Sequence, residues 1–149
     1  MTALNLILVS HHAYLISDTA QYTDDGAVSG FGQKVIAHPL AKMACGVAGP
    51  FEAVAWASKI LGRCGSIDEA ELGFFDALRA EYPRIAASVS PDQGLGVIAA
   101  GFSDDKHECR ALAATSADKF AGQIIPGRDE NGRGVEISIL IPMIGGNRT

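Results

Sequence analysis

The chain has few charged residues and no long apolar run, and both absences limit what it can be. Only 19% of its 149 residues are charged, while 48% are hydrophobic, which is the composition of a globular protein and not of a disordered one. The apolar stretch from Leu4 to Val9 is far shorter than the roughly 20 residues that span a bilayer. It also lacks a preceding basic segment, so we expect neither a membrane helix nor a signal peptide. We therefore expect a cytoplasmic protein.

Clusters of cations and pairs of cysteines are missing as well. The net charge is −5, and no group of Lys and Arg residues exists to replace the counterions of a polyanion, so we expect binding to neither nucleic acid nor an anionic membrane. The three cysteines, Cys45, Cys64 and Cys109, form no CxxC pair, which argues against disulfides and structural zinc. His11 and His12 have no third ligand nearby and are interpreted as exposed turn residues. We expect no metal and no cofactor.

The length and the apolar patterns predict one α+β domain over residues 1–149. Continuous or alternating apolar residues predict strands, a hairpin and a last strand over 3–10, 13–22, 33–38, 43–47, 92–100, 108–114 and 135–141. Pro50 suits the first turn of a helix. Ser66, followed three residues later by Glu69, is the capping-box signature of a second helix. The glycine-rich residues 120–134 are predicted to form a loop.

The start of the chain carries the pattern that suggests chemistry. Met1 precedes Thr2, and removal of Met before so small a residue leaves Thr2 with a free α-amine. The hydroxyl of a Thr is a weak nucleophile, and an N-terminal amine with a pKa near ~8 can act as its base. Lys34 and Asp18 complete the set, because a Lys ammonium favours the Thr alkoxide and keeps the amine neutral, while an Asp holds the Lys charged and in place.

With these residues the chain resembles the N-terminal nucleophile (Ntn) hydrolases of the proteasome β-subunit type, including the bacterial ATP-dependent peptidase. Asp18 follows Thr2 by sixteen residues and Lys34 by thirty-two, which is the family spacing. The likeness continues through a strand, glycine turn and helix start at 42–53 and the hairpin up to about residue 113. The resemblance implies an αββα sandwich of two packed antiparallel sheets covered by helices, here with a truncated C-terminal part.

The same resemblance implies a function and site residues. It assigns Thr2 as nucleophile, Lys34 and Asp18 as its support, and the N–H of Gly49 as oxyanion donor in a threonine-type peptidase or amidohydrolase. It also implies a homo-oligomer that acts on a peptide or small amide substrate. An ATPase partner and a ring size do not follow from the sequence.

A second reading stays open beside the enzyme. Ala20 stands where many family members carry a basic or amide side chain, and the supporting Ser and Asp of the family have only Ser116, Asp118 and Asp129 as candidates. The alternative is a catalytically inactive proteasome-like scaffold or interaction subunit, in which Asp18 and Lys34 are a structural ion pair and Thr2 is a strand residue.

Overall fold

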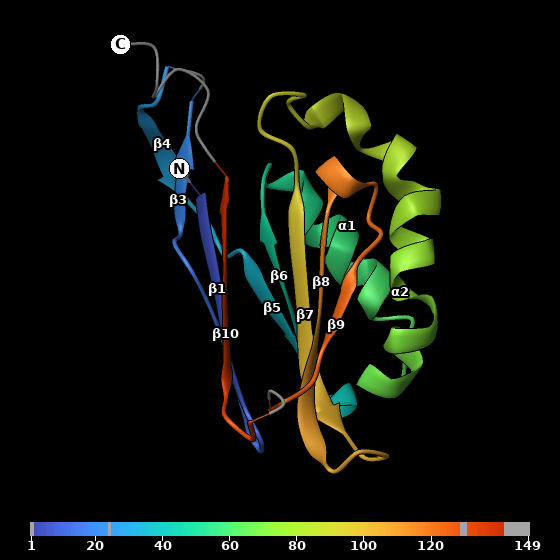
Figure 1. Ribbon diagram of the computed structural model, residues 1–149. Coiled ribbons are helices and arrows are strands. Elements are labelled where there is room, and N and C mark those ends of the chain that lie inside the picture. The colour runs from blue at the N-terminus through green and yellow to red at the C-terminus, as the bar shows by residue number, and fades with distance from the viewer. Residues whose placement is uncertain (1, 24, 129–130, 142–149) are drawn as a thin grey trace.

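The computed structural model describes residues 2–23, 25–128 and 131–141. Within them the predicted α+β class is confirmed: two α-helices accompany three antiparallel sheets (Figure 1). Short 3-10 turns join some of these elements, namely η1 (Pro39–Ala41), η2 (Tyr82–Arg84), η3 (Ala86–Ser88) and η4 (Ser116–Asp118).

The first sheet gathers the two ends of the described chain. Its strand order is β10-β1-β2, and its members are β1 (Thr2–Val9), β2 (His12–Ser17) and β10 (Val135–Ile141). Successive side chains of a strand point to opposite faces, and Leu4, Leu6 and Leu8 are all fully buried on one of them. The sheet therefore turns one apolar face inward.

The second sheet is a short hairpin that the sequence did not predict. Residues 13–22 were predicted as one strand, but that prediction is wrong, because the chain leaves the ladder of β1 after Ser17 and enters β3 (Ala20–Tyr22) in another sheet. β3 pairs with β4 (Val28–Phe31). Between them the N–H of Gly26 donates to the carbonyl of Thr23, and Gly26 has φ 86°, as expected of a glycine turn.

The third sheet is the centre of the molecule. Its order is β5-β6-β7-β8-β9, with bounds β5 (Val35–His38), β6 (Met43–Ala48), β7 (Gly96–Ser103), β8 (Glu108–Thr115) and β9 (Gln123–Ile125). β9 lies in the segment predicted as a loop. Strand β6 and residues 96–102 of β7 carry no polar side chain because both faces of these strands are covered.

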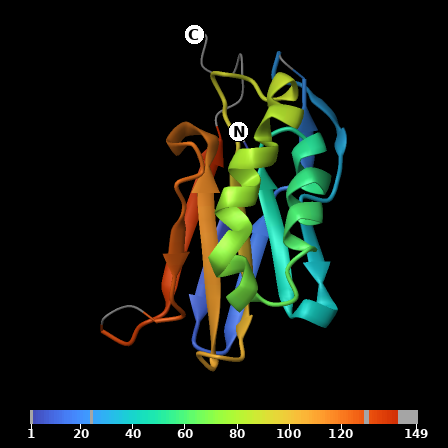
Figure 2. The same ribbon diagram turned by 90° about the vertical axis from the view of Figure 1, so that its right-hand side faces the viewer.

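Two helices cover one face of this sheet (Figure 2). They are α1 (Glu52–Leu61) and α2 (Ile67–Glu81). The predicted cap of α2 is confirmed, since the hydroxyl of Ser66 accepts from the N–H of Glu69 at 3.2 Å. The carboxylate of Glu69 accepts in turn from the N–H of Gly65 at 2.7 Å, so both partners of the cap are satisfied.

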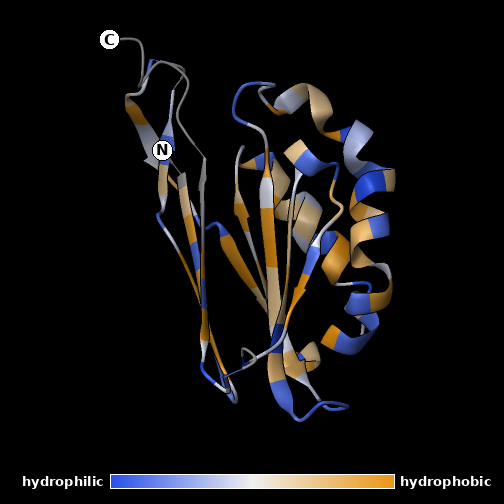
Figure 3. Cartoon of the chain, in the orientation of Figure 1, coloured by the Kyte–Doolittle hydropathy of each residue, from blue (hydrophilic) through white to orange (hydrophobic). Residues whose placement is uncertain are grey.

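Alternate side chains of β7 enter two separate cores. Val97 and Ala99 are buried with the apolar faces of α1 and α2, whereas Ile98 and Ala100 are buried with the leucines of β1. Apolar colour accordingly runs along the central strands, and polar colour gathers on the turn between β7 and β8 (Figure 3).

The predicted sandwich of two sheets covered by helices is not confirmed. The described strands form three sheets, and both described helices lie on the same side, against the five-stranded sheet. None of the helices in the described part of the chain has the length and apolar character needed to cross a bilayer.

Candidate active site

A buried ammonium lies at the start of β5. Lys34 is only 4% exposed, and its Nζ donates to Oδ1 of Asp18 at 2.8 Å and to the carbonyl of Ala20 at 2.7 Å. A buried charge requires such partners, because burying it unpaired destabilises the folded state by several kcal/mol. Two of the three ammonium N–H groups have acceptors in the described structure, which leaves one donor for a further group.

Asp18 reaches Lys34 because the chain changes sheets there. It is the first residue after β2, and its N–H donates to the carbonyl of Ala3 at 3.4 Å, which extends the pairing of β1 with β2 by one step. The carboxylate is then turned to Lys34 and remains 29% exposed. Asp18 thus connects the N-terminal end of β1 to the ammonium.

Thr2 is the first residue of β1, and its backbone pairs with Ile141 of β10. Its backbone therefore lies one residue before the Ala3 carbonyl that Asp18 contacts. Met1 and the side chain of Thr2 lie outside the described part of the chain. The structure brings Asp18 and Lys34 together, and Thr2 immediately precedes the β1 residue, Ala3, whose carbonyl accepts from the N–H of Asp18.

Gly49 lies in the turn between β6 and α1, at the same end of the molecule as the start of β1 (Figure 1). Its φ is +153°, and a Cβ there would meet Cδ1 of Leu95 at 2.8 Å, so a side chain at this position would be strained and would have to displace Leu95. Among the described residues its N–H donates to no acceptor. A free backbone N–H just before a helix is a suitable donor to a developing negative charge.

Two contributions to this site were missed from the sequence. The acceptor that shares Lys34 with Asp18 is the backbone carbonyl of Ala20, which no side-chain pattern could reveal. A Cβ on Gly32 would meet the amide of Gln21 and the ring of Phe51, so these two side chains border the loop that leads to Lys34. Both follow from tertiary contacts and left no local signal.

The candidates for a supporting Ser and Asp have different positions. The hydroxyl of Ser116 accepts from the N–H of Leu95 at 2.9 Å, and Leu95 is the residue that backs Gly49. Ser116 therefore supports the turn that holds Gly49. Asp118 is exposed in η4, and Asp129 lies outside the described residues.

Other nucleophiles near the core are unsuited to chemistry. Burial raises the pKa of the Cys45 thiol to about 12, so it carries no thiolate near neutral pH. Ser58 shares a hydrogen bond of 2.9 Å with Nε2 of His38, but Ser58 is only 7% exposed. This pair links α1 to the end of β5 and offers no access to a substrate.

His11 and His12 are exposed, as predicted, but only His11 lies in the turn. The prediction that His12 also lies there is wrong, because His12 is the first residue of β2 and pairs with Val9. In the described ranges no group of three or more His, Cys, Asp or Glu side chains is placed to hold a metal ion.

Comparison with known proteins identifies a similar fold but does not assign the chain to a family. No protein-family model and no curated protein sequence matches the chain. Among solved structures, Anbu (ancestral beta-subunit) from Yersinia bercovieri superposes with a TM-score of 0.59 over 91% of the chain. The fold resembles that of Anbu. The two sequences are 14% identical, and the match spans 59% of the Anbu chain.

These findings correct the family prediction. The sequence predicted membership of the N-terminal nucleophile hydrolases of the proteasome β-subunit and ATP-dependent peptidase type. That prediction is wrong as a statement of membership, because no family model matches and a likeness to Anbu at 14% identity shows the fold alone. A shared fold does not transfer an activity, which has to be argued from the site.

Proposed function

We propose that the chain is a hydrolase of peptide or other amide bonds whose nucleophile is Thr2 after removal of Met1. The observation that carries the proposal is the Lys34 ammonium, 4% exposed and held at 2.8 Å by Asp18 beside the N-terminal end of β1. A buried cation that leaves one donor unused among the described residues is costly in a purely structural role. Next to an N-terminal Thr it has a chemical use.

The proposed reaction divides the hydrolysis into two steps. The Thr2 hydroxyl attacks the amide carbonyl carbon while its proton passes to the Thr2 α-amine, and this amine then protonates the departing nitrogen as the C–N bond breaks. Water hydrolyses the resulting ester and restores the hydroxyl. Lys34 stabilises the alkoxide, Asp18 positions Lys34, and the N–H of Gly49 stabilises the oxyanion. Loss of such an oxyanion donor costs about 10²–10³ in rate.

The assembly state is part of the proposal. We propose that residues 1–149 act as one domain within a homo-oligomer. The likeness in fold to a protein described as a beta-subunit supports this.

The second candidate is a catalytically inactive scaffold or interaction subunit. It is favoured by the internal pairing of Lys34, whose two bonds to Asp18 and to the Ala20 carbonyl already hold β2, β3 and β5 together. In that case the ion pair serves stability alone, and Thr2 needs no free amine.

The test is the intact mass of untagged protein, followed by reaction with a peptide epoxyketone, an electrophile that needs both a free N-terminal amine and the adjacent hydroxyl. The expected result is loss of Met1 and a single adduct. Thr2→Ala should remove the adduct, and Thr2→Ser should retain it at a lower rate.

One substitution at the buried ion pair and one at an exposed ion pair make the test specific. Asp18→Asn should slow labelling at least ~10-fold because Lys34 loses its anchoring charge. Lys42→Met, at an exposed ion pair elsewhere, should label as the unchanged protein does. A folded protein that keeps Met1, or whose free Thr2 never labels, would overturn the enzyme proposal in favour of the scaffold.

A further inference from the structure

The hairpin of β7 and β8 ends on a side chain instead of a backbone carbonyl. Its last paired residues are Gly96 and Thr115. Beyond them the N–H of Ser116 donates to the carbonyl of Leu95 at 2.8 Å, and the N–H of Leu95 donates to the hydroxyl of Ser116 at 2.9 Å. In an antiparallel ladder such a pair exchanges both bonds between backbone groups. The Ser116 hydroxyl therefore takes the place that the Ser116 carbonyl would have in a regular ladder.

The Ser116 carbonyl belongs instead to the turn that follows β8. It accepts from the N–H of Lys119 at 3.1 Å, and the carbonyl of Thr115 accepts from the N–H of Phe120 at 2.9 Å. Lys119 and Phe120 have φ of 58° and 54°, a left-handed conformation that residues with a Cβ adopt uncommonly. Two such residues in succession persist only where the surrounding structure fixes them.

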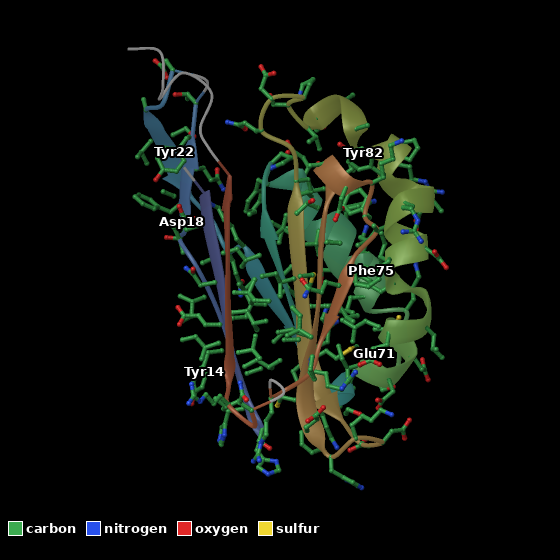
Figure 4. All side chains as sticks on the ribbon, viewed as in Figure 1. Tyr14, Asp18, Tyr22, Glu71, Phe75 and Tyr82 are labelled. Atoms are coloured by element: carbon green, nitrogen blue, oxygen red, sulfur yellow. The ribbon has the colours of Figure 1, made fainter. Side chains whose placement is uncertain are left out.

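Contacts with α2 fix this turn, which comprises residues 115–120. The carbonyl of Phe120 accepts from Nη1 of Arg79 at 2.6 Å. The ring of Phe120 is buried and meets the ring of Tyr82 edge-on, at 5.1 Å between centroids. Tyr82 lies where α2 ends (Figure 4). Arg79 thus holds the backbone of the turn, while the aromatic contact holds its side chain.

Leu95 connects the turn to Gly49. The side chain of Leu95 is 1% exposed, and its Cδ1 lies 2.8 Å from the position that a Cβ on Gly49 would take. The Cα of Leu95 lies 3.5 Å from the same position. Close-packed groups transmit displacements to one another, so a movement of Leu95 changes the support behind Gly49 and the direction of its N–H.

We propose that Ser116 and Arg79 are positioning residues for the N–H of Gly49. Ser116 fixes Leu95, against which Gly49 is packed, and Arg79 fixes the turn that presents the Ser116 hydroxyl to Leu95. The use of this N–H as an oxyanion donor rests on the proposed function, whereas the linkage from α2 to Gly49 is a property of the fold. Such a donor has to lie about 2.7–3.1 Å from the oxyanion, so a small displacement weakens it.

The first measurement is amide hydrogen exchange of the full chain by mass spectrometry, together with the methyl NMR resonances of Leu95. Ser116→Ala removes the acceptor of the Leu95 N–H, so exchange there should accelerate roughly 5–10-fold, the effect of one hydrogen bond. The methyl resonances should shift because the packing of Leu95 on Gly49 changes. Ser116→Thr keeps the hydroxyl and should preserve both readouts. Circular dichroism confirms that each variant is folded.

The contribution of α2 is measured in the same way. Arg79→Met frees the carbonyl of Phe120 and should accelerate exchange at Leu95 by about 2–5-fold, since it acts through the turn. Arg63→Met is the matched control, because Arg63 is paired with Glu81 near the end of the same helix, and it should leave exchange at Leu95 unchanged. If Arg79→Met does not fold, Arg79→Lys provides the measurement, since an ammonium cannot reproduce the geometry of the guanidinium.

Labelling with a peptide epoxyketone connects the linkage to the chemistry. Ser116→Ala should lower the maximal rate of labelling at Thr2 on the order of 10-fold, less than the 10²–10³ that loss of the donor itself costs. The epoxyketone concentration that gives half the maximal rate should not change, because the donor acts on the oxyanion. If the unchanged protein never labels, the proposed function fails, but exchange and the methyl resonances still decide whether Ser116 and Arg79 position Gly49.

Several results would overturn the proposal. Leu95 methyl resonances that do not move in Ser116→Ala would show that Gly49 keeps its support without the hydroxyl. Equal effects of Arg79→Met and Arg63→Met on exchange at Leu95 would separate α2 from the site. Labelling of a folded Ser116→Ala at the unchanged rate, or a Ser116→Thr variant that behaves like Ser116→Ala, would likewise contradict a role for the hydroxyl.

Discussion

Two lysines lie at opposite ends of the hairpin formed by β5 and β6, and they differ in everything but their chemistry. Lys34 precedes β5 and is paired with Asp18 at 2.8 Å, whereas Lys42 precedes β6 and is paired with Asp104 at 3.1 Å. The first pair is 4% and 29% exposed, and the second is 58% and 67% exposed. The two N–O distances are similar, but the surroundings are not.

The comparison shows that the N–O distance alone does not determine how much an ion pair contributes to stability. Water screens the exposed pair, and such pairs contribute about 0–1 kcal/mol. The buried ammonium has given up its hydration, so loss of one partner leaves an uncompensated charge. The buried pair of Lys34 is thus needed for the stability of its end of the hairpin, whereas the exposed pair of Lys42 adds little at the other end.

The largest expected effect tests this contrast directly. Asp18→Ala leaves the Lys34 ammonium buried without its counterion and should lower the free energy of unfolding by roughly 3–5 kcal/mol. Asp104→Ala is the matched change at the exposed pair and should cost no more than about 1 kcal/mol. Urea denaturation measures both. Equal costs would mean that water reaches Lys34 and that the contrast does not exist.

The glycine at the Lys34 end comes next. Gly49→Ala forces a Cβ against Leu95 at φ +153° and should cost about 1–3 kcal/mol. Gly73→Ala is the control, because Gly73 is in α2 with nothing within 4 Å of an added Cβ. It should stabilise the protein by about 0.5–1 kcal/mol. Thermal or urea unfolding that gives the same sign for both would contradict the close packing behind Gly49.

Cys45 lies on β6 between the two ends of the hairpin. Titration of its thiol reports whether water reaches the middle of the hairpin. Burial raises the pKa of its thiol from 9.0 to about 12. Above pH 9 the unfolded chain loses this proton and the folded chain keeps it, so stability falls by about 1.4 kcal/mol per pH unit up to the folded pKa.

The measurement is the difference in unfolding free energy between the unchanged protein and Cys45→Ala at pH 8, 9 and 10, which removes the titration of other groups. The difference should be constant below pH 9 and should decline above it. A difference that is independent of pH would show that the thiol is accessible to water.

The smallest effect belongs to the exposed end. Lys42→Met should change stability by less than about 1 kcal/mol, and the change should vanish in about 1 M salt because the charges of the pair are screened there. Denaturation at low and high salt checks it. A change that persists in high salt would assign Lys42 a packing role, for instance through its position 5.8 Å from the ring centre of Phe102.

The sequence predicted the elements whose signals are local. The apolar runs of β1 and β6, the pattern of α1 and the cap of Ser66 on α2 each specify their own structure, and all are present. The strands β4 and β9 have four and three residues and depend on pairing with β3 and β8, so no local pattern marked them. The break after Ser17 was missed for the same reason, since it depends on what Asp18 and Ala20 bind.

The candidate site also has parts that the sequence indicated and a part that it could not. The residue types of Thr2, Asp18 and Lys34 could be read from the sequence, but their grouping came from a family pattern. Their catalytic roles and that of Gly49 stay a prediction. The carbonyl of Ala20 could not be predicted, because a backbone acceptor is independent of the side chain that marks its position.

The position of Lys34 also has a mechanical consequence. Asp18 belongs to the end of the first sheet, Ala20 to the hairpin of β3 and β4, and Lys34 to the start of the central sheet. One nitrogen atom therefore fastens three sheets that share no backbone hydrogen-bond ladder. The hairpin of β3 and β4 cannot move away from the body of the molecule without breaking the hydrogen bond from Lys34 to the Ala20 carbonyl, so that movement would deprive the buried ammonium of one of its two acceptors.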